Sequence, residues 1–203
     1  MLAYRAAFSN EVETKWEDAV WTLHTDINAS LAYCDDFIES MCKKFNTEDY
    51  FVVFSPKTNF RYDLFPAYKG NRKNKRKPLA LSEIIKQVCK RHTFMLQDGM
   101  EADDLIGIMC TQAPKTTIAN KNHLIQTLMG DATDGYQGLK GVGPKTAVKL
   151  LDKHGWDWEG VVKIYESKDM TEEDALLTAR LAYILRTENF KDGKIILWQP
   201  PTK

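Results

Sequence analysis

Apolar residues recur at helical spacing along the first part of the chain. From Val12 to Phe45 they fall three or four positions apart, which is typical of one face of an amphipathic helix. Asn10 and Glu13 have the spacing of a capping box at its start. The pattern therefore predicts one long helix between Val12 and Phe45, with a break near Asn28.

Short runs of β-branched and aromatic residues alternate with helical patterns farther along. YFVVF (50–54) has the size of a buried parallel strand, and shorter strands are expected at TFMLQ (93–97) and KIILW (194–198). The expected helices are 82–92, 101–110, 144–154 and 171–188. Alternating strands and helices predict an α/β fold with a parallel-type central sheet flanked by helices, and a last third that is mostly helical.

Composition places the chain among soluble globular proteins. It has 203 residues, of which 43% are apolar, enough to bury a core in one domain with at most a small appendage. No apolar run approaches the roughly 20 residues of a membrane helix, and the N-terminus lacks the features of a secretory signal. The four cysteines are scattered and fit reduced thiols. We therefore expect a cytoplasmic location, in a bacterial host if the gene is viral.

Charge is balanced overall but uneven along the chain. Lysine plus arginine and aspartate plus glutamate each total 28. A basic segment, 57–77, has a single acid and interleaved aromatic residues. Its cations are Lys57, Arg61, Lys69, Arg72, Lys73, Lys75, Arg76 and Lys77, and its aromatics are Phe60, Tyr62, Phe65 and Tyr68. Contact with nucleic acid and an ordinary solvated face both stay open for this segment.

Two acidic motifs are candidates for metal binding. EADD (101–104) begins a predicted helix, and GDATDG (130–135) lies farther along. Carboxylates this close repel one another unless a positive group lies among them, and all-oxygen ligands suit magnesium or manganese. If the two motifs met, they could hold two cations about 4 Å apart for phosphodiester cleavage. Ordinary helix-start acidity and an Asp-Gly turn are the simpler interpretations.

A glycine-rich loop, GLKGVGPKTA, precedes the helix expected from Pro144. Its glycines let the backbone approach a ligand, and a helix N-terminus directs free N–H groups toward an anion. The spacing is not that of a Walker loop, because Pro144 separates Gly143 from Lys145. Binding of a DNA backbone phosphate fits better.

Four motifs in this order resemble the flap-endonuclease family of 5′ nucleases, in particular the 5′→3′ exonucleases of tailed bacteriophages. They are YKGNR (68–72), EADD (101–104), GDATDG (130–135) and GVGPKTA (141–147). The resemblance implies an α/β core, a helix-three-turn-helix motif that binds duplex DNA, and hydrolysis of duplex or branched DNA from its 5′ end with two Mg²⁺ or Mn²⁺ ions. An RNA–DNA hybrid is a further candidate substrate, and a role in phage DNA replication follows from the same resemblance.

The resemblance also assigns roles to individual residues. The residues matching the family's metal ligands are Glu101, Asp103, Asp104, Asp131 and Asp134. Lys69, Arg72 and Asp104 match catalytic positions, the two cations acting on the scissile phosphate. The residues expected to contact DNA are Arg61, Tyr68, Lys69, Arg72, Gly141, Gly143, Lys145, Thr146 and Lys149. Gly141, Gly143 and Lys145 fall on a hairpin that often binds K⁺ in relatives. Binding of K⁺ at this hairpin is therefore a further expectation.

Four family acids have no counterpart in the sequence. One would precede Met1, a second would fall near Pro56, and an Asp-x-Asp pair should lie between Gln112 and His123, where only APKTTIANKN stands. Our hypothesis is that segments before Met1 and around 115–120 have been removed. A mass clearly above 23.3 kDa for the intact protein would support it.

The resemblance suggests a nuclease core over 1–129, containing segment 57–77, and a DNA-binding region over 130–203. Two alternatives to an active nuclease stay open. One is a DNA-binding module of the same family that has lost its catalytic acids, and the other is an acid-rich α/β domain of another kind, such as a phosphatase-like domain. Cleavage together with binding separates the three. Protein partners are unknown.

Overall fold

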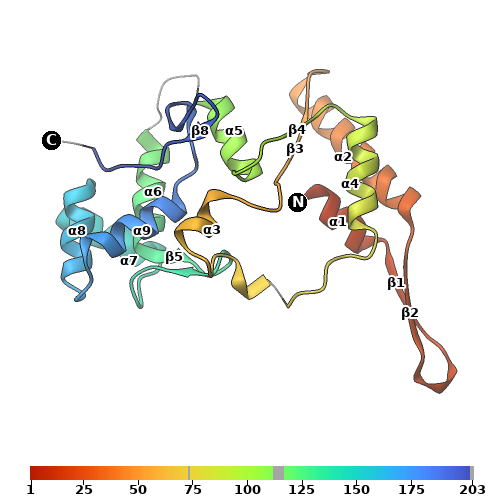
Figure 1. Cartoon of the computed structure of the whole chain (residues 1–203), viewed down its shortest axis with the longest axis horizontal. Helices are drawn as coiled ribbons and strands as arrows, with labels where there is room; N and C mark the ends of the chain where they lie inside the picture. The colour runs from red at the N-terminus through yellow and green to blue at the C-terminus, as the bar shows by residue number, and fades with distance from the viewer. Residues whose placement is uncertain (73, 112–116, 202–203) are drawn as a thin grey trace. The chain divides into compact units, whose positions relative to one another are not determined.

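The computed structural model describes residues 1–72, 74–111 and 117–201 (Figure 1). The chain forms two compact units, one of residues 1–54 and 75–95 and the other of residues 55–74 and 96–203. These units do not coincide with the division expected at residue 129. Segment 57–77, treated above as one basic stretch, is shared between them.

The first unit is built around three helices. Its elements are α1 (Leu2–Ser9), β1 (Glu11–Lys15), η1 (Glu17–Ala19), β2 (Trp21–Thr25), α2 (Ile27–Phe45), β3 (Val52–Phe54), α4 (Leu81–Arg91) and the start of β4 (Phe94–Leu96). Its core is small and comes from α1, α2 and α4, with Ala6, Cys34 and Ile84 fully buried. β3 pairs with β4 beside this core.

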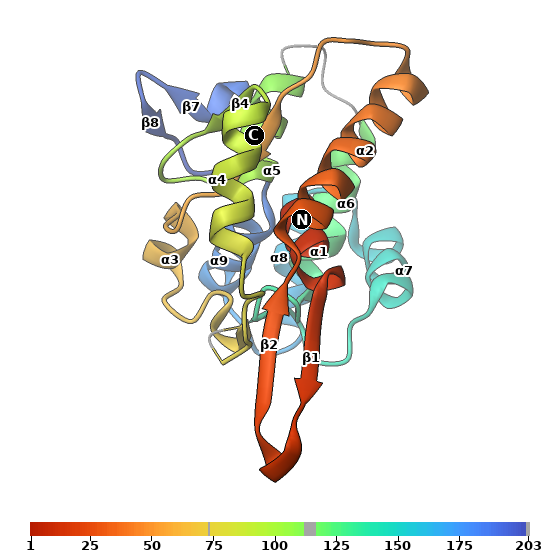
Figure 2. The same cartoon turned by 90° about the vertical axis from the view of Figure 1, so that its right-hand side faces the viewer.

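The long helix expected from Val12 to Phe45 is wrong in its first half. Residues 11–25 form an antiparallel hairpin, with Glu11 opposite Thr25 and Lys15 opposite Trp21 (Figure 2). β-branched residues alternate with charged ones here, a pattern that suits a strand better than a helix. The helix begins only at Ile27, where the Asp26 side chain accepts a hydrogen bond from the Ala29 N–H at 2.9 Å.

The second unit is mainly helical. Its elements are α3 (Phe60–Leu64), η2 (Gly70–Arg72), α5 (Ala102–Cys110), α6 (Thr117–Met129), β5 (Gly130–Asp131), β6 (Tyr136–Gln137), α7 (Pro144–His154), α8 (Trp158–Glu166), α9 (Glu172–Ala182), η3 (Thr187–Asn189), β7 (Phe190–Lys191) and β8 (Lys194–Ile195). Leu128, Leu151 and Ile164 are fully buried where α6, α7 and α8 pack together. The helices expected from Pro144 and Thr171 are confirmed, although α9 ends at Ala182.

The expected central parallel sheet is absent from the part of the chain that the structure describes. The strands form four separate two-stranded sheets, three of which are antiparallel. YFVVF yields three residues of strand, which pair only with β4 among the described residues, and KIILW yields two, which pair only with β7. The fold is therefore mixed α/β with small sheets.

Two further features bear on the sequence-based expectations. The four cysteines are unpaired, but Cys110 is exposed and not part of a core. Within residues 1–72, 74–111 and 117–201, no helix has the length and apolar character needed to span a membrane.

Candidate active site

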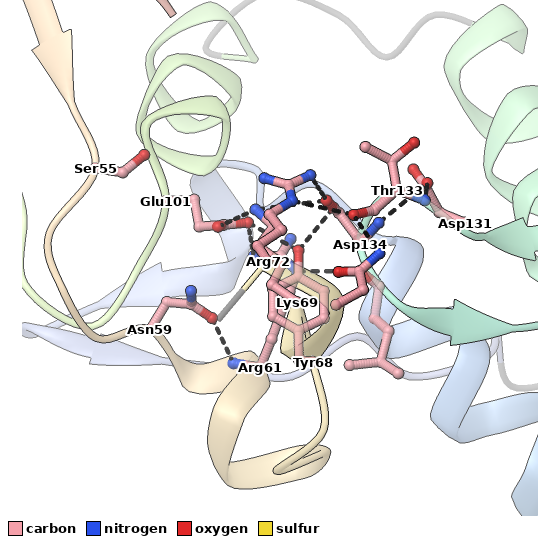
Figure 3. A network of polar contacts seen from close by, with 12 residues as sticks. Ser55, Asn59, Arg61, Tyr68, Lys69, Arg72, Glu101, Asp131, Thr133 and Asp134 are labelled. Atoms are coloured by element: carbon pink, nitrogen blue, oxygen red, sulfur yellow. Dashed lines mark hydrogen bonds and ion pairs between the residues drawn. The ribbon is translucent and has the colours of Figure 1, made fainter. Parts of the chain in front are cut away.

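The site lies within the second unit, where segments distant in the sequence meet. Glu101 precedes α5, and Asp104 in the first turn of that helix accepts a hydrogen bond from the Glu101 N–H at 3.1 Å. The Asp103 side chain, by contrast, is exposed. Of the EADD acids, therefore, Glu101 and Asp104 join the polar network of the site and Asp103 does not. Glu101 lies among the other polar side chains of this network in Figure 3.

Asp131 and Asp134 play different parts in the turn between β5 and β6. Asp131 Oδ1 accepts hydrogen bonds from the N–H groups of Thr133 at 2.7 Å and Asp134 at 3.3 Å, so it shapes the turn. The Asp134 carboxylate instead faces Tyr68 and Arg72 (Figure 3). Asp134 therefore belongs to the polar network of the site, whereas Asp131 stabilises the backbone of the turn.

Tyr68 joins the two acidic motifs. Its hydroxyl lies 3.0 Å from Oε2 of Glu101 and 2.9 Å from Oδ2 of Asp134. Burial raises the pKa of this phenol, so it stays protonated and has one proton to donate. The two carboxylates therefore share a single donor, and their remaining charge has to be balanced by other groups.

Two cations supply that balance. Lys69 Nζ lies 2.5 Å from Oε1 of Glu101 and 3.6 Å from Oδ1 of Asp134. Arg72 Nη2 donates to Oδ1 of Asp134 at 2.6 Å, and Arg72 Nε donates to the Thr133 carbonyl at 3.1 Å. Lys69 has a positive φ of 53°, which marks a turn in the backbone just before η2. The structure thus brings the expected catalytic residues Lys69 and Arg72 onto the two acids.

Arg61 and Asp104 form a separate, deeply buried pair. The guanidinium makes a bidentate contact, from Nη1 to Oδ2 at 2.6 Å and from Nη2 to Oδ1 at 2.9 Å, and the two side chains are 4% and 0% exposed. Burial opposes the charge of Arg61, but Asp104 outweighs it and the pKa of the guanidinium is raised. Sequence analysis missed this pair, because Arg61 stands within a run of surface-type cations.

The described residues do not form a closed metal site. Among them, no three His, Cys, Asp or Glu side chains are grouped so as to hold an ion. Asp103 is exposed, Asp131 holds its turn and Asp104 is bound to Arg61. Glu101 and Asp134 are the two acids that meet at the Tyr68 hydroxyl. The five-acid ligand set expected from the resemblance is therefore not assembled in this arrangement.

The residues expected to contact DNA fall into an exposed set and a buried set. Lys145, Thr146 and Lys149 are exposed on α7, directly after the loop that holds Gly141 and Gly143. Tyr68 is 1% exposed and Arg61 is 4% exposed. Direct DNA contact by Arg61 and Tyr68 is not supported by this geometry, since a side chain needs exposed surface to meet a phosphate or a base.

The rest of the basic segment is also partly committed to internal ion pairs. In the first unit, Arg76 contacts both carboxylate oxygens of Glu11, and this contact lowers the pKa of Glu11. Lys57, Lys75 and Lys77 are exposed, and Lys73 lies outside the described residues. For the exposed lysines, contact with nucleic acid and an ordinary solvated face both stay open.

Comparison with known proteins identifies the family. Residues 1–138 match the family described as 5′-3′ exonuclease, N-terminal resolvase-like domain. The chain belongs to this 5′-3′ exonuclease family. This family member is 26% identical to the exonuclease of Escherichia phage T7, over 98% of the present chain and 91% of the phage protein. That alignment runs over 272 residues, so the phage protein has internal residues with no counterpart in a chain of 203.

Solved structures show the same fold. A phage T5 5′-exonuclease with zinc bound has a TM-score of 0.58 at 17% identity, covering 75% of this chain and 80% of its own. A phage T5 flap endonuclease in a complex with DNA and metal ions has a TM-score of 0.57, with the same identity and coverage. The hypothesis of a removed segment concerns residues 115–120. Residues 115 and 116 lie outside the described residues, and residues 117–120 form the start of α6.

Proposed function

We propose that this exonuclease family member hydrolyses phosphodiester bonds of duplex or flapped DNA from the 5′ end. One observation carries the proposal. Glu101 and Asp134, 33 positions apart, meet at the Tyr68 hydroxyl with Lys69 and Arg72 beside them. The phage T7 relative is an exonuclease and the T5 neighbours include a flap endonuclease, which supports this reaction class.

We further propose that the reaction requires a divalent cation, Mg²⁺ or Mn²⁺. The T5 5′-exonuclease was crystallised with divalent metal. In the present chain Glu101 and Asp134 are the carboxylates best placed to contribute oxygen ligands, and they fall short of a full set. Two ions at this site and K⁺ at the hairpin stay predictions, as does activity on an RNA–DNA hybrid.

Lys69 and Arg72 are the groups that we expect to act on the scissile phosphate. Both carry positive charge at the point where the two acidic motifs meet. A cation held in a fixed position stabilises negative charge as it develops on a phosphate, and it needs no reorganisation to do so. Arg72 is the more accessible, since 42% of its side chain is exposed, compared with 18% for Lys69.

The start of α7 is the part of the chain that we propose to grip the DNA backbone. Pro144 occupies the first turn of α7, a position that suits proline. At this helix N-terminus the free backbone N–H groups point toward the preceding loop. Lys145 and Thr146 are exposed at this end, and such an end attracts phosphate. With α6 before the loop, the segment has the order expected of a helix-three-turn-helix motif, and its contacts would not read sequence.

Cleavage of a 5′-labelled flapped duplex tests this function. We expect short 5′ products in Mg²⁺ or Mn²⁺, none with a chelator, and a large loss of rate in the Asp134→Asn variant. The matched control is Asp36→Asn, since Asp36 is an exposed acid on α2. Salt-sensitive binding without cleavage in either metal would instead show a DNA-binding module, and absence of binding would rule out both.

A further inference from the structure

We propose that Arg61 and Asp104 act as a positioning pair that fixes Glu101, and that neither side chain binds metal or DNA directly. The expected effect on turnover rests on the proposed function. The pairing itself does not, because it can be tested through folding and metal binding alone.

The acceptor capacity of Asp104 is fully used. A carboxylate has about four lone-pair positions on its two oxygens. Oδ1 accepts from Arg61 Nη2 at 2.9 Å and from the Leu185 N–H at 3.0 Å. Oδ2 accepts from Arg61 Nη1 at 2.6 Å and from the Glu101 N–H at 3.1 Å. No position is left for a cation, and the side chain is fully buried.

The donor capacity of Arg61 is also largely used inside the protein. Besides its two contacts with Asp104, Nε donates to the Leu181 carbonyl at 3.0 Å, and Nη2 donates to the Tyr183 carbonyl at 2.7 Å. These carbonyls lie at the end of α9 and just beyond it, where helix carbonyls lack partners within the helix. Arg61 therefore ties α3 to α9 and cannot reach a phosphate from where it is.

The pair acts on Glu101 in two ways. Asp104 holds the backbone N–H of Glu101, and Arg61 Nη1 lies 3.6 Å from Oε2 of the same residue. Oε2 is also the oxygen that faces the Tyr68 hydroxyl. The buried pair thus sets where the Glu101 carboxylate points, while Lys69 contacts Oε1 and Tyr68 contacts Oε2.

The alternative is that Asp104 leaves Arg61 to bind a metal, as its place in the EADD motif suggests. That movement would take the bidentate partner away from a buried guanidinium and would leave the N–H groups of Glu101 and Leu185 without their acceptor. Removing one partner of a buried pair is strongly unfavourable. A ligand role for Asp104 therefore requires the surrounding helix ends to rearrange, whereas the positioning role requires no change.

A folding cycle tests the pair without any nuclease assay. Arg61→Met and Asp104→Asn should each lower the equilibrium constant for folding by a hundredfold or more, because each leaves one buried charge unpaired. If the two losses were independent, the double variant would lower the folding constant by the product of the two single effects. We expect its folding constant to be at least tenfold higher than that product implies. Additive losses in urea unfolding would overturn the pairing.

Binding of Mn²⁺, followed by the electron paramagnetic resonance signal of the free ion, tests the ligand role. We expect Asp104→Asn, or the double variant if the single one is unfolded, to bind Mn²⁺ less than tenfold more weakly than the native protein, because Glu101 keeps its charge and loses only its fixed orientation. Glu101→Gln and Asp134→Asn should bind it at least tenfold more weakly. A loss for Asp104→Asn equal to that of Glu101→Gln would overturn the proposal.

The kinetics of Arg61→Lys separate positioning from DNA contact. Lysine keeps the charge but cannot make the bidentate contact, so Glu101 should lose its fixed orientation. We expect kcat on a flapped duplex to fall by tenfold or more with KM for DNA unchanged, because α7 is untouched. A raised KM with unchanged kcat would show that Arg61 contacts DNA.

Discussion

The Lys69 ammonium lies 2.5 Å from Oε1 of Glu101, and each side chain is 18% exposed. A pair this well shielded is screened less than a surface ion pair. In this arrangement Glu101 holds Lys69 where Asp134 is also within 3.6 Å. One cation thus serves both acidic motifs.

Lys69→Ala should therefore lower turnover on a 5′-flapped duplex by about a hundredfold or more, the usual cost of removing one fixed electrostatic donor. Lys168→Ala is the matched control, because Lys168 is an exposed lysine beyond α8. Single-turnover rates measure both variants. Equal rates for Lys69→Ala and the native enzyme would remove Lys69 from the mechanism.

Tyr68→Phe should destabilise the protein by about 1 kcal/mol, because two partly buried carboxylate oxygens lose their shared donor. The ring itself stays packed against Tyr136, so the change isolates the hydroxyl. Tyr62→Phe is the control, since the Tyr62 ring contacts that of Tyr68 edge to face. Urea unfolding of both variants gives the comparison, and equal stabilities would show that the bridge contributes nothing.

Gly143→Ala should leave stability unchanged but weaken binding of duplex DNA. The backbone of Gly143 is extended, and a Cβ there would meet no atom within 4 Å, so the free protein does not require glycine. A DNA phosphate approaching the start of α7 would require it. Gly141→Ala, at a φ of 77°, should cost about 1 kcal/mol of stability as well. Unchanged DNA affinity for Gly143→Ala would argue against backbone contact at this loop.

Lys145→Ala should weaken DNA binding for every sequence alike and reduce the slope of log K against log salt by about 1. Lys163→Ala on α8 is the control, since its ammonium contacts Glu159 within its own helix. Fluorescence anisotropy with two unrelated duplexes at several salt concentrations measures both quantities. A loss confined to one duplex would contradict contact with the backbone.

His123 should make stability depend on pH. Burial lowers its pKa from 6.5 to about 4, and Nε2 contacts the Ala179 carbonyl at 2.9 Å. The unfolded chain then binds more protons between pH 4 and 6.5, so stability present at pH 7 is lost as pH falls through this window. The loss should be about 2 kcal/mol by pH 4.5. His123→Gln should flatten the difference in unfolding free energy between pH 7 and 4.5, and an unchanged difference would exclude His123 as its source.

The resemblance to 5′ nucleases predicted that both acidic motifs belong to one site, whereas their spacing in the sequence left open whether they meet. Glu101, Asp134 and Lys69 lie together in the structure. The burial of Arg61 and Tyr68 could not be inferred, since their partners come from α5, α9 and the β5–β6 turn, far away in the sequence. The sequence of a basic segment does not indicate which of its cationic side chains are buried.

Periodicity failed where two patterns overlap. Val12, Trp16 and Val20 are spaced like a helix face, yet all three side chains are exposed and belong to or flank a hairpin. Apolar residues four positions apart fit one face of a helix and also one face of a strand. The segment forms a strand because it pairs with β2. The central sheet failed for a different reason, since a run of β-forming residues says nothing about whether neighbouring strands exist to pair with it.

Cleavage of a 5′-labelled duplex with a short flap tests the central claim most directly. The native chain, Glu101→Gln and Asp134→Asn would be compared in Mg²⁺, in Mn²⁺ and with a chelator. We predict short 5′ products from the native chain that require the metal and fall by at least a hundredfold in both variants. Tight duplex binding with no product in either metal would contradict the claim that this chain is a 5′ nuclease.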